Sequence, residues 1–420
     1  MFRQPFRVHW GLRFGCEHPF YITAGFVLLI RLPFLWAVVM KPECALMPDS
    51  ATYIAMADNL TDPSIHRTPG YPLFLAAIRC FSYSPIPIAM VQSFLAAVTG
   101  ILVTCIAYRL SPSRNGSARL AGILAGIFFA ADAVSAGYSC LMLTESLCAL
   151  VLTTTVALLV LSPGSPGQLI GVGILNGLNA LIQPVAMLCV IAQLPYGYLK
   201  IRSRRYGLAL LIAFSLLLPG IWILRNGLST GVYTLSDIAT LNLYCYRAAA
   251  IVAELKQLPF EEVQQSMREE WNRELTETSL THTEQLQRIR SRAITIIYQH
   301  PDLAMKHAAI GLVKMLFGPG RELYLRFFHS VPPLFLTLLL AYSLVHILVV
   351  YLCAGMYFYR SKRPEKWLFL LTILYFCLLS MGPEAYSRFR VPIMPLFCIT
   401  AGLGIPFRTE RMGDKIAEEG

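Results

Sequence analysis

The sequence has little charge for its length. Only 14% of its 420 residues are Asp, Glu, Lys or Arg, whereas 56% are hydrophobic. Soluble domains contain roughly 25% charged residues, so this deficit excludes an ordinary soluble enzyme. The sequence also lacks the alternating segments of a transmembrane β-barrel. Together with repeated long apolar runs, these absences predict an all-α polytopic membrane protein.

Several chemical signatures are missing as well. The eleven cysteines form no CxxC pair and have no metal-like spacing, and the sequence contains neither a Walker loop nor an HExxH pattern. The net charge is +11, but the basic residues fall mainly between the apolar runs. That distribution is typical of membrane orientation signals. We therefore assign the positive charge to topology and not to nucleic-acid binding.

The apolar runs and the basic residues between them predict a topology. Arg3, Arg7 and Arg13 precede the first run, residues 20–40, which places the N-terminus in the cytoplasm. Alternation of later basic segments then gives about ten spans of roughly 20 residues, with both termini inside. In residues 169–199, the central Gln183-Pro184 pair predicts a break into two short helices.

This topology divides the chain into three predicted parts. Residues 1–224 form an N-terminal membrane core whose first external loop, residues 41–84, is expected to be catalytic. Residues 225–330 form an external, mostly helical region, since residues 261–300 are charged and have helical spacing. Residues 331–420 carry the C-terminal transmembrane helices and a cytoplasmic tail.

The first polar block after the first span contains Asp49 at the start of a predicted amphipathic, interfacial helix. Asp49 is either the N-cap of that helix or a general base, and the local sequence favours neither. Further along the same loop, His66 and Arg67 precede a rigid Pro-Gly-Tyr-Pro segment. Arg67 either snorkels to lipid headgroups or belongs to a fixed site.

Three later segments place more charged residues near the same membrane face. Glu145 opens an apolar helix, where it stabilises the helix dipole or has a function; we favour function, because acids at such positions are costly. Arg388 and Arg390 lie in a short external loop, and Arg225 ends an outward-going span. They are either headgroup anchors or, with Arg67, a basic pocket suited to phosphate.

Together these segments resemble the GT-C superfamily of polyprenyl-phosphate-sugar glycosyltransferases. The closer likeness is to the bacterial branch related to protein O-mannosyltransferases and aminoarabinose lipid A transferases. A second acid beside the first, found in eukaryotic mannosyltransferases, is absent. The matching residues are Asp49-Ser50 with Tyr53, the run 67–75 with Arg67 and Tyr71, Tyr138-Ser139, Thr144 to Leu147, Gln183-Pro184, Arg225-Asn226, and the run 388–392.

The resemblance implies a GT-C type bundle with interfacial helices in the first external loop. It also implies a cell inner membrane enzyme, active towards the periplasm or exterior, that takes a sugar from a polyprenyl-phosphate carrier by inverting transfer. The acceptor would be a lipid, a glycan or a protein. The catalytic candidates are Asp49 and Glu145, and the substrate-binding candidates are Tyr53, His66, Arg67, Tyr71, Arg225, Arg388 and Arg390.

Some features stay open in the sequence. Glu145 would position the acceptor or help to hold a divalent metal ion, and the sequence does not decide between them. The sugar, the acceptor and the oligomeric state are also open. The alternative function is a transporter or flippase of a lipid-linked sugar, which would place polar residues at mid-membrane, whereas here they gather at the outer interface.

Overall fold

The computed structural model describes residues 18–111, 116–161, 164–200, 204–276 and 280–405. These residues form helices joined by short connections, and they contain no β-strand. The all-α fold class is therefore confirmed. The basic residues of the predicted N-terminal and C-terminal cytoplasmic segments, Arg3, Arg7, Arg13, Arg408 and Arg411, lie outside the described residues.

Four of the described helices are long and apolar enough to cross a membrane: α1 (His18–Met40), α4 (Pro85–Leu110), α10 (Arg204–Thr230) and α17 (Pro333–Arg360). The other predicted spans correspond to shorter helices. These are α5 (Gly116–Ala131), α7 (Glu145–Leu161), α8 (Pro166–Ile182), α9 (Cys189–Lys200), α18 (Glu365–Ser380) and α19 (Met394–Gly404). A helix of 17 residues is about 25 Å long, somewhat less than the roughly 30 Å of a bilayer's hydrocarbon core.

The predicted break at Gln183-Pro184 is present. Helix α8 ends at Ile182, a 3₁₀ turn covers Pro184–Leu188, and α9 follows. Proline at the first position of the turn has no N–H to continue the ladder of α8. This apolar run therefore folds as two helices, as its sequence predicts.

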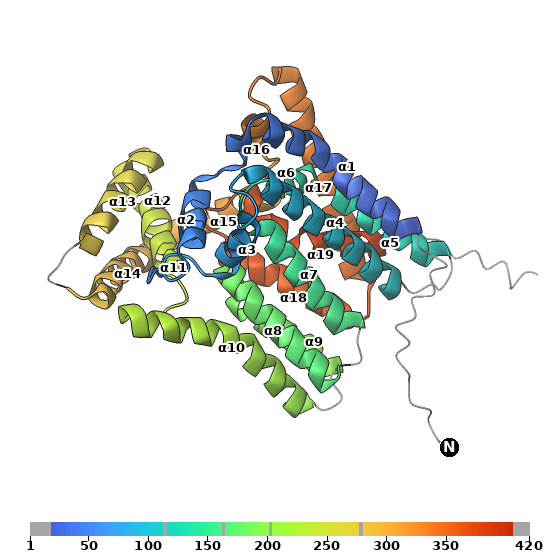
Figure 1. The fold of residues 1–420 in the computed structure, drawn as a ribbon, viewed down its shortest axis with the longest axis horizontal. Coiled ribbons are helices and arrows are strands. Elements are labelled where there is room, and N and C mark those ends of the chain that lie inside the picture. The colour runs from blue at the N-terminus through green and yellow to red at the C-terminus, as the bar shows by residue number, and fades with distance from the viewer. Residues whose placement is uncertain (1–17, 112–115, 162–163, 201–203, 277–279, 406–420) are drawn as a thin grey trace, which may run out of the picture.

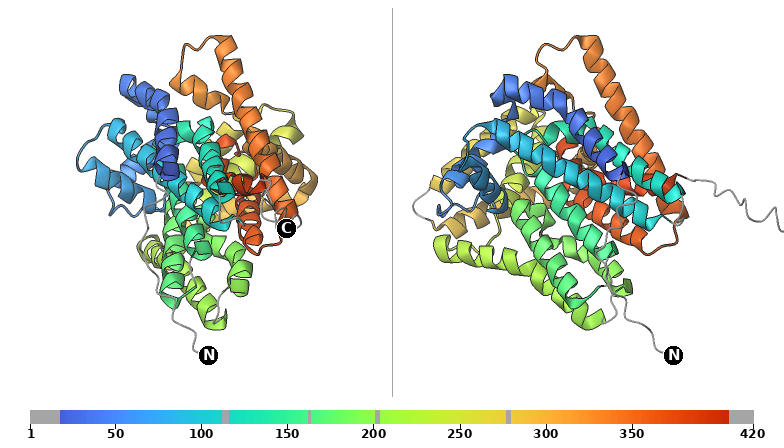
Figure 2. Two further views of the ribbon diagram at one scale, coloured as in Figure 1. Left: turned by 90° about the vertical axis from the view of Figure 1, so that its right-hand side faces the viewer. Right: turned by 45° about the vertical axis from the view of Figure 1, so that its right-hand side comes forward.

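The helical bundle packs closely through small residues. Helix α4 packs against α1, α5 and α7, while α19 packs against α5 and α17, and the two views of Figure 2 show α1, α4 and α5 running alongside one another. A Cβ atom added to Gly402 would lie 2.5 Å from the Ala121 carbonyl oxygen. Such close approach of backbones is typical of helix packing in membranes.

A second group of helices lies to one side of the bundle (Figure 1). It contains α11 (Ile238–Asn242), a π-helical turn (Leu243–Ala248), α12 (Ala249–Lys256), α13 (Phe260–Thr276) and α14 (His282–Gln299). These helices bury their own hydrophobic cluster, which includes Trp271 and Ile289. Ile65 from the first polar loop joins that cluster, so the loop is anchored to these helices.

Helices α15 (Pro301–Phe317) and α16 (Arg321–Phe327) lead from this group back to α17. Three irregular regions then approach one another at one end of the bundle. They are the loop that contains α2 (Pro48–Asp58) and precedes α3 (Gly70–Arg79), the segment between α6 (Ala133–Tyr138) and α7, and the 3₁₀ helix Ser387–Ile393 before α19. The candidate site lies where they meet.

Candidate functional site

Two arginines and two carboxylates form a connected ion-pair network. Arg67 Nη2 lies 2.7 Å from Asp49 Oδ1, and Arg388 Nη1 lies 2.6 Å from Asp49 Oδ2. The Nε–H of Arg388 donates to Glu145 Oε1. The network thus joins Asp49, Arg67, Glu145 and Arg388, which come from positions spread over 340 residues of the sequence.

Asp49 lies in the first turn of α2, which begins at Pro48 and has Met47 as its N-cap residue. The interpretation of Asp49 as the N-cap is therefore wrong, because its carboxylate binds the two guanidinium groups instead. Ser50 fixes the start of the helix, since its hydroxyl accepts from the Met47 N–H and donates to the Met142 carbonyl. That second bond ties α2 to the segment that leads to Glu145.

The Arg67 side chain is held on several sides. Its Nε–H donates to Thr52 Oγ1 at 2.8 Å, and its guanidinium group lies 4.4 Å from the centre of the Tyr53 ring. Tyr53 in turn packs edge-on against Tyr71, with ring centres 5.0 Å apart. The structure thus brings together three predicted site residues: Tyr53 of α2, Tyr71 of α3, and Arg67 of the loop between these helices.

Glu145 is fully buried at the first residue of α7, and Arg388 is 8% exposed. Glu145 Oε2 has no hydrogen-bond partner among the described residues. A buried carboxylate is costly unless it is paired, and Arg388 supplies the partner of Glu145. Arg388 thus contacts both carboxylates, while Arg67 contacts Asp49 alone.

The electrostatics of the network fix the protonation state of Asp49. Burial by itself would raise the pKa of the Asp49 carboxyl, but the guanidinium groups of Arg388 and Arg67 outweigh this effect and lower the pKa to about 2. Asp49 is therefore ionised at any ordinary pH. Both of its oxygens already accept a charged hydrogen bond.

A buried glutamine positions the segment that carries Glu145. Gln92 of α4 donates from Nε2 to the carbonyl oxygens of Ser139 and Leu141, at 3.2 and 2.5 Å. Tyr71 OH donates to Gln92 Oε1 at 2.7 Å. Residues 139–144 are irregular, and these bonds supply partners for the backbone carbonyls of Ser139 and Leu141, which no helix pairs.

His66 and Arg225 lie beside the network and not within it. His66 Nδ1 is 2.8 Å from Asp237 Oδ1. Arg225 stacks on Trp222 and donates to the Asp62 carbonyl. His66 therefore ties the first polar loop to the segment that follows α10, and Arg225 ties the loop to α10 itself.

Arg390 has different surroundings from Arg388. It is fully buried, and its Nη1–H groups donate to the carbonyls of Met315 and Gly318, at 3.2 and 2.6 Å. Its Nε and Nη2 have no partner among the described residues. The guanidinium group therefore satisfies carbonyls at the end of α15, away from the Asp49 network.

The sequence also holds site residues that were not predicted. Arg31 is fully buried in α1 and donates from Nε to Ser139 Oγ at 2.9 Å, beside the segment that carries Glu145. Its signal was readable, because it is the sole ionised side chain of the first apolar run. Gln92 and Asp237 gave no local signal, since their partners lie 47 and 171 residues away.

One short pattern proves unrelated to the site. Residues 227–231 read Gly-x-Ser-x-Gly, a pattern that marks a nucleophile when it follows a strand and opens a helix. Here it ends α10, and the exposed Ser229 donates to the Asn226 carbonyl at 3.3 Å. The context required for a nucleophile elbow is therefore not met.

The described residues contain no group of three or more His, Cys, Asp and Glu side chains placed to hold a metal ion. The carboxylates of Asp49 and Glu145 are bridged by the Arg388 guanidinium group. The cationic partner of these carboxylates is thus supplied by the chain itself.

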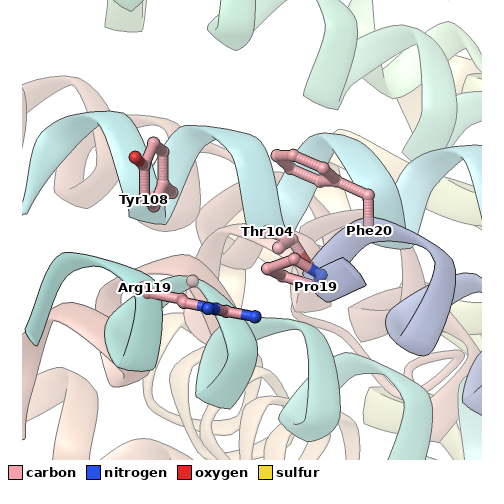
Figure 3. Close-up of a pocket in the computed structure, with 6 residues that line it drawn as sticks. Pro19, Phe20, Thr104, Tyr108 and Arg119 are labelled. Carbon is pink, nitrogen blue, oxygen red and sulfur yellow. The ribbon is translucent and has the colours of Figure 1, made fainter. Parts of the chain in front are cut away.

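A shallow recess occurs at the opposite end of α1 and α4 (Figure 3). It lies between the first turn of α1, the last turns of α4 and the start of α5, and Arg119 borders it. The candidate site follows the other ends of these helices, after Met40 and before Pro85. The recess therefore has no part in the ion-pair network.

Comparison with known proteins gives a distant structural likeness. No family model and no curated protein matches the chain. Among solved structures, the chain is similar to the archaeal oligosaccharyltransferase AglB from Archaeoglobus fulgidus, determined in complex with an inhibitory peptide and a dolichol-phosphate. The identity is 12% and the TM-score is 0.43; the match covers 93% of this chain and 50% of that protein. This chain thus spans half of its neighbour's length.

Proposed function

We propose that this protein is an integral membrane glycosyltransferase. It would transfer a sugar from a polyprenyl-phosphate carrier to a lipid, glycan or protein acceptor, with inversion, on the outer face of the cytoplasmic membrane. The observation that carries the proposal is the convergence of Arg67 and Arg388 on Asp49, just outside the membrane helices α1 and α4.

Two guanidinium groups at one point suit a phosphate. Arg presents a planar fork of donors that matches phosphate oxygens, and both forks here are already aimed at an anion, the Asp49 carboxylate. Arg388 is 8% exposed, so water screens its charge little. We propose that the carrier phosphate binds against these two groups.

The same two groups would assist the chemical step. The oxygen of the acceptor attacks the anomeric carbon, the bond between that carbon and the phosphate oxygen breaks, and the electron pair leaves with the phosphate. Charge then develops on the leaving oxygen, where preorganised guanidinium donors stabilise it. A phosphate is a good leaving group and needs no strong acid.

Asp49 and Glu145 are proposed to hold the arginines in this arrangement. Each donates nothing while ionised and accepts from a guanidinium group, so together they fix Arg388 from two sides. Glu145 is fully buried, and its second carboxylate oxygen has no hydrogen-bond partner among the described residues. We propose that this oxygen accepts a hydrogen bond from the acceptor substrate. Arg67 also stacks on the Tyr53 ring, which in turn packs against Tyr71.

A transporter of a lipid-linked sugar is the alternative. It requires polar groups that open onto a path across the membrane. The buried amides Asn176 and Gln193 instead pair with each other, at 2.8 and 3.0 Å, and Asn176 also reaches Ser215. Satisfied pairs of this kind join membrane helices, so they give the transporter no support.

The test is a transfer assay on the purified protein with a panel of radiolabelled polyprenyl-phosphate sugars and mixed acceptors. We expect transfer by the wild type, a loss of donor affinity of about 10–100-fold in Arg67→Lys, and a strong loss of turnover in Asp49→Asn. Arg79→Lys is the matched control, because Arg79 pairs with the exposed Asp58 in the same loop region. Transport without transfer, or Arg67→Lys behaving like Arg79→Lys, would contradict the proposal.

A further inference from the structure

A histidine–aspartate pair lies one residue from the ion-pair network. His66 Nδ1 is 2.8 Å from Asp237 Oδ1, and the Asp237 side chain is 8% exposed whereas that of His66 is 31% exposed. The hydrogen bonds of His66 in the described part of the chain involve Nδ1 and the backbone. In the neutral ring, a proton on Nδ1 shared with Asp237 leaves the lone pair of Nε2 free towards solvent.

The backbone holds this histidine in place. The Ser236 hydroxyl donates to the His66 carbonyl at 2.7 Å, and the Asp237 N–H donates to the Ile65 carbonyl at 3.2 Å. Ile65 is buried in the hydrophobic cluster that includes Trp271 of α13 and Ile289 of α14. The next residue, Arg67, reaches Asp49, so the backbone of His66 is fixed directly before the arginine of the proposed phosphate site.

Asp49 is poorly suited to take a proton in this arrangement. Both of its oxygens accept from guanidinium groups, and those groups keep its pKa at about 2. A general base works best when its pKa is near the operating pH. An imidazole meets that condition, and a carboxylate on its far nitrogen is the usual means of orienting it.

We propose that His66 is the proton acceptor of the transfer reaction and that Asp237 is its positioning residue. This inference rests on the function proposed above. As the acceptor oxygen bonds to the anomeric carbon, its proton passes to His66 Nε2, and the electron pair of the broken bond leaves with the phosphate. Asp237 stabilises the resulting imidazolium, which then loses its proton to water. Asp49 is left to hold Arg67 and Arg388.

The charged groups around His66 allow a clear pH signature. Asp237 faces the ring directly, Asp62 and Arg67 lie on the same loop, and Arg225 reaches that loop from α10. Asp49 stays ionised above pH 4, and so does the phosphodiester of the donor. Imidazole is the side-chain type that changes charge between about pH 5 and 8, so a histidine proton acceptor makes the rate for a hydroxyl acceptor depend on pH.

The experiment measures kcat/KM for a hydroxyl acceptor from pH 5 to 9, together with donor affinity. We expect wild-type kcat/KM to rise with pH, because only an unprotonated imidazole can accept the proton. His66→Gln should lose this rise and roughly 10²–10⁴-fold in rate at pH 8, with donor affinity unchanged. His282→Gln, a histidine of α14 that faces Gln285, is the control and should match the wild type.

Asp237→Asn provides the second variant. An amide still holds the ring but no longer stabilises the imidazolium, so the rate should fall and the midpoint should move to lower pH. A role limited to tethering the loop predicts a change in thermal stability with the midpoint unmoved.

The results separate the two proposals. A wild type that transfers sugar with a flat profile from pH 5 to 9, or a His66→Gln protein as active as His282→Gln, overturns this inference alone. If His66→Gln fails to fold, an unmoved midpoint in Asp237→Asn overturns it instead. A wild type without transfer from any carrier-linked donor overturns the proposed function, and this inference with it.

Discussion

At the scale of single residues, Arg388 and Arg390 show how two side chains two positions apart acquire different roles. Arg388 faces Asp49 and Glu145, while Arg390 faces the carbonyls of Met315 and Gly318. From the sequence the two arginines appear equivalent, and both were expected to bind phosphate. The 3₁₀ helix in which they lie has about three residues per turn, so residues two apart point in different directions.

This difference gives the first prediction. Arg388→Lys keeps the charge but cannot reach both carboxylates through a planar fork. We expect donor affinity to fall by about 10–100-fold, since a charge-assisted hydrogen bond is worth about 1.5–3 kcal/mol. Arg390→Lys should leave donor affinity unchanged, because its amine still reaches a backbone carbonyl. Equilibrium binding of a polyprenyl-phosphate donor measures both.

The same two variants can also contradict this prediction. Thermal melting of both proteins should be recorded, because Arg390→Lys is expected to affect stability and not binding. Equal losses of donor affinity in the two variants would show that Arg390 also binds phosphate, as the sequence suggested.

A second residue-scale prediction concerns metal ions. The Arg388 guanidinium group lies between Asp49 and Glu145, so a divalent cation there would have to displace a buried charge of its own sign. We therefore expect the transfer rate to be unchanged after chelation with EDTA. Loss of activity that Mg²⁺ or Mn²⁺ restores would assign these carboxylates to a metal instead.

At the scale of elements, the position of Arg67 depends on a close contact of α3 with α8. A Cβ atom on Gly70, the first residue of α3, would lie 2.7 Å from the Leu181 carbonyl carbon and oxygen and 2.8 Å from the Ile182 nitrogen. Backbone atoms cannot move aside as a flexible side chain can. The glycine therefore sets how closely the loop of Arg67 approaches the end of α8.

Gly70→Ala is the third prediction. We expect it to destabilise the protein by about 1–3 kcal/mol, as other overpacked contacts do, and to lower transfer by displacing Arg67. Gly171→Ala in α8 is the control: a Cβ there meets nothing within 4 Å, and alanine favours a helix by up to about 1 kcal/mol. Melting temperature and transfer rate measure both effects. A Gly70→Ala protein as stable and active as Gly171→Ala would show that the contact is not limiting.

The elements themselves could be predicted from the sequence to different degrees. Apolar run length gave α1, α4, α10 and α17, and the proline at 184 gave the break after α8. Helix α7 begins at Glu145, although residues 141–144 before it are as apolar as the helix itself. Their backbone is instead held by Gln92 and the α2 loop, which are distant in sequence.

The candidate site was predictable in its members and not in its pairings. Asp49, Arg67, Glu145 and Arg388 stood out because charges are rare beside apolar runs. Which carboxylate meets which arginine depends on how the three irregular regions meet, and no local pattern encodes that. The pairing of His66 with Asp237, 171 residues away, is of the same kind.

At the scale of the whole molecule, two contacts far from the site define its other end. Lys200 at the end of α9 pairs with Glu365 at the start of α18, with Nζ and Oε1 2.8 Å apart. Arg363, in the connection between α17 and α18, donates to the Leu110 carbonyl at the end of α4. The described basic connections therefore lie at one end of the bundle, and the Asp49 network lies at the other.

This arrangement gives the last prediction, on sidedness. Helix α10 separates Arg205 from Thr276, and α17 separates Thr276 from Ser361; both helices are long and apolar enough to cross a membrane. We expect epitope tags inserted beside Arg205 and after Ser361 in the full chain to be cytoplasmic, because basic residues are retained on that side. A tag after Thr276 should be reached by antibody from outside, along with the Asp49 loop. All three tags on one side would mean that α10 and α17 do not cross, and the ion-pair network would then lose its place at the outer membrane face, where a carrier-linked sugar is proposed to bind.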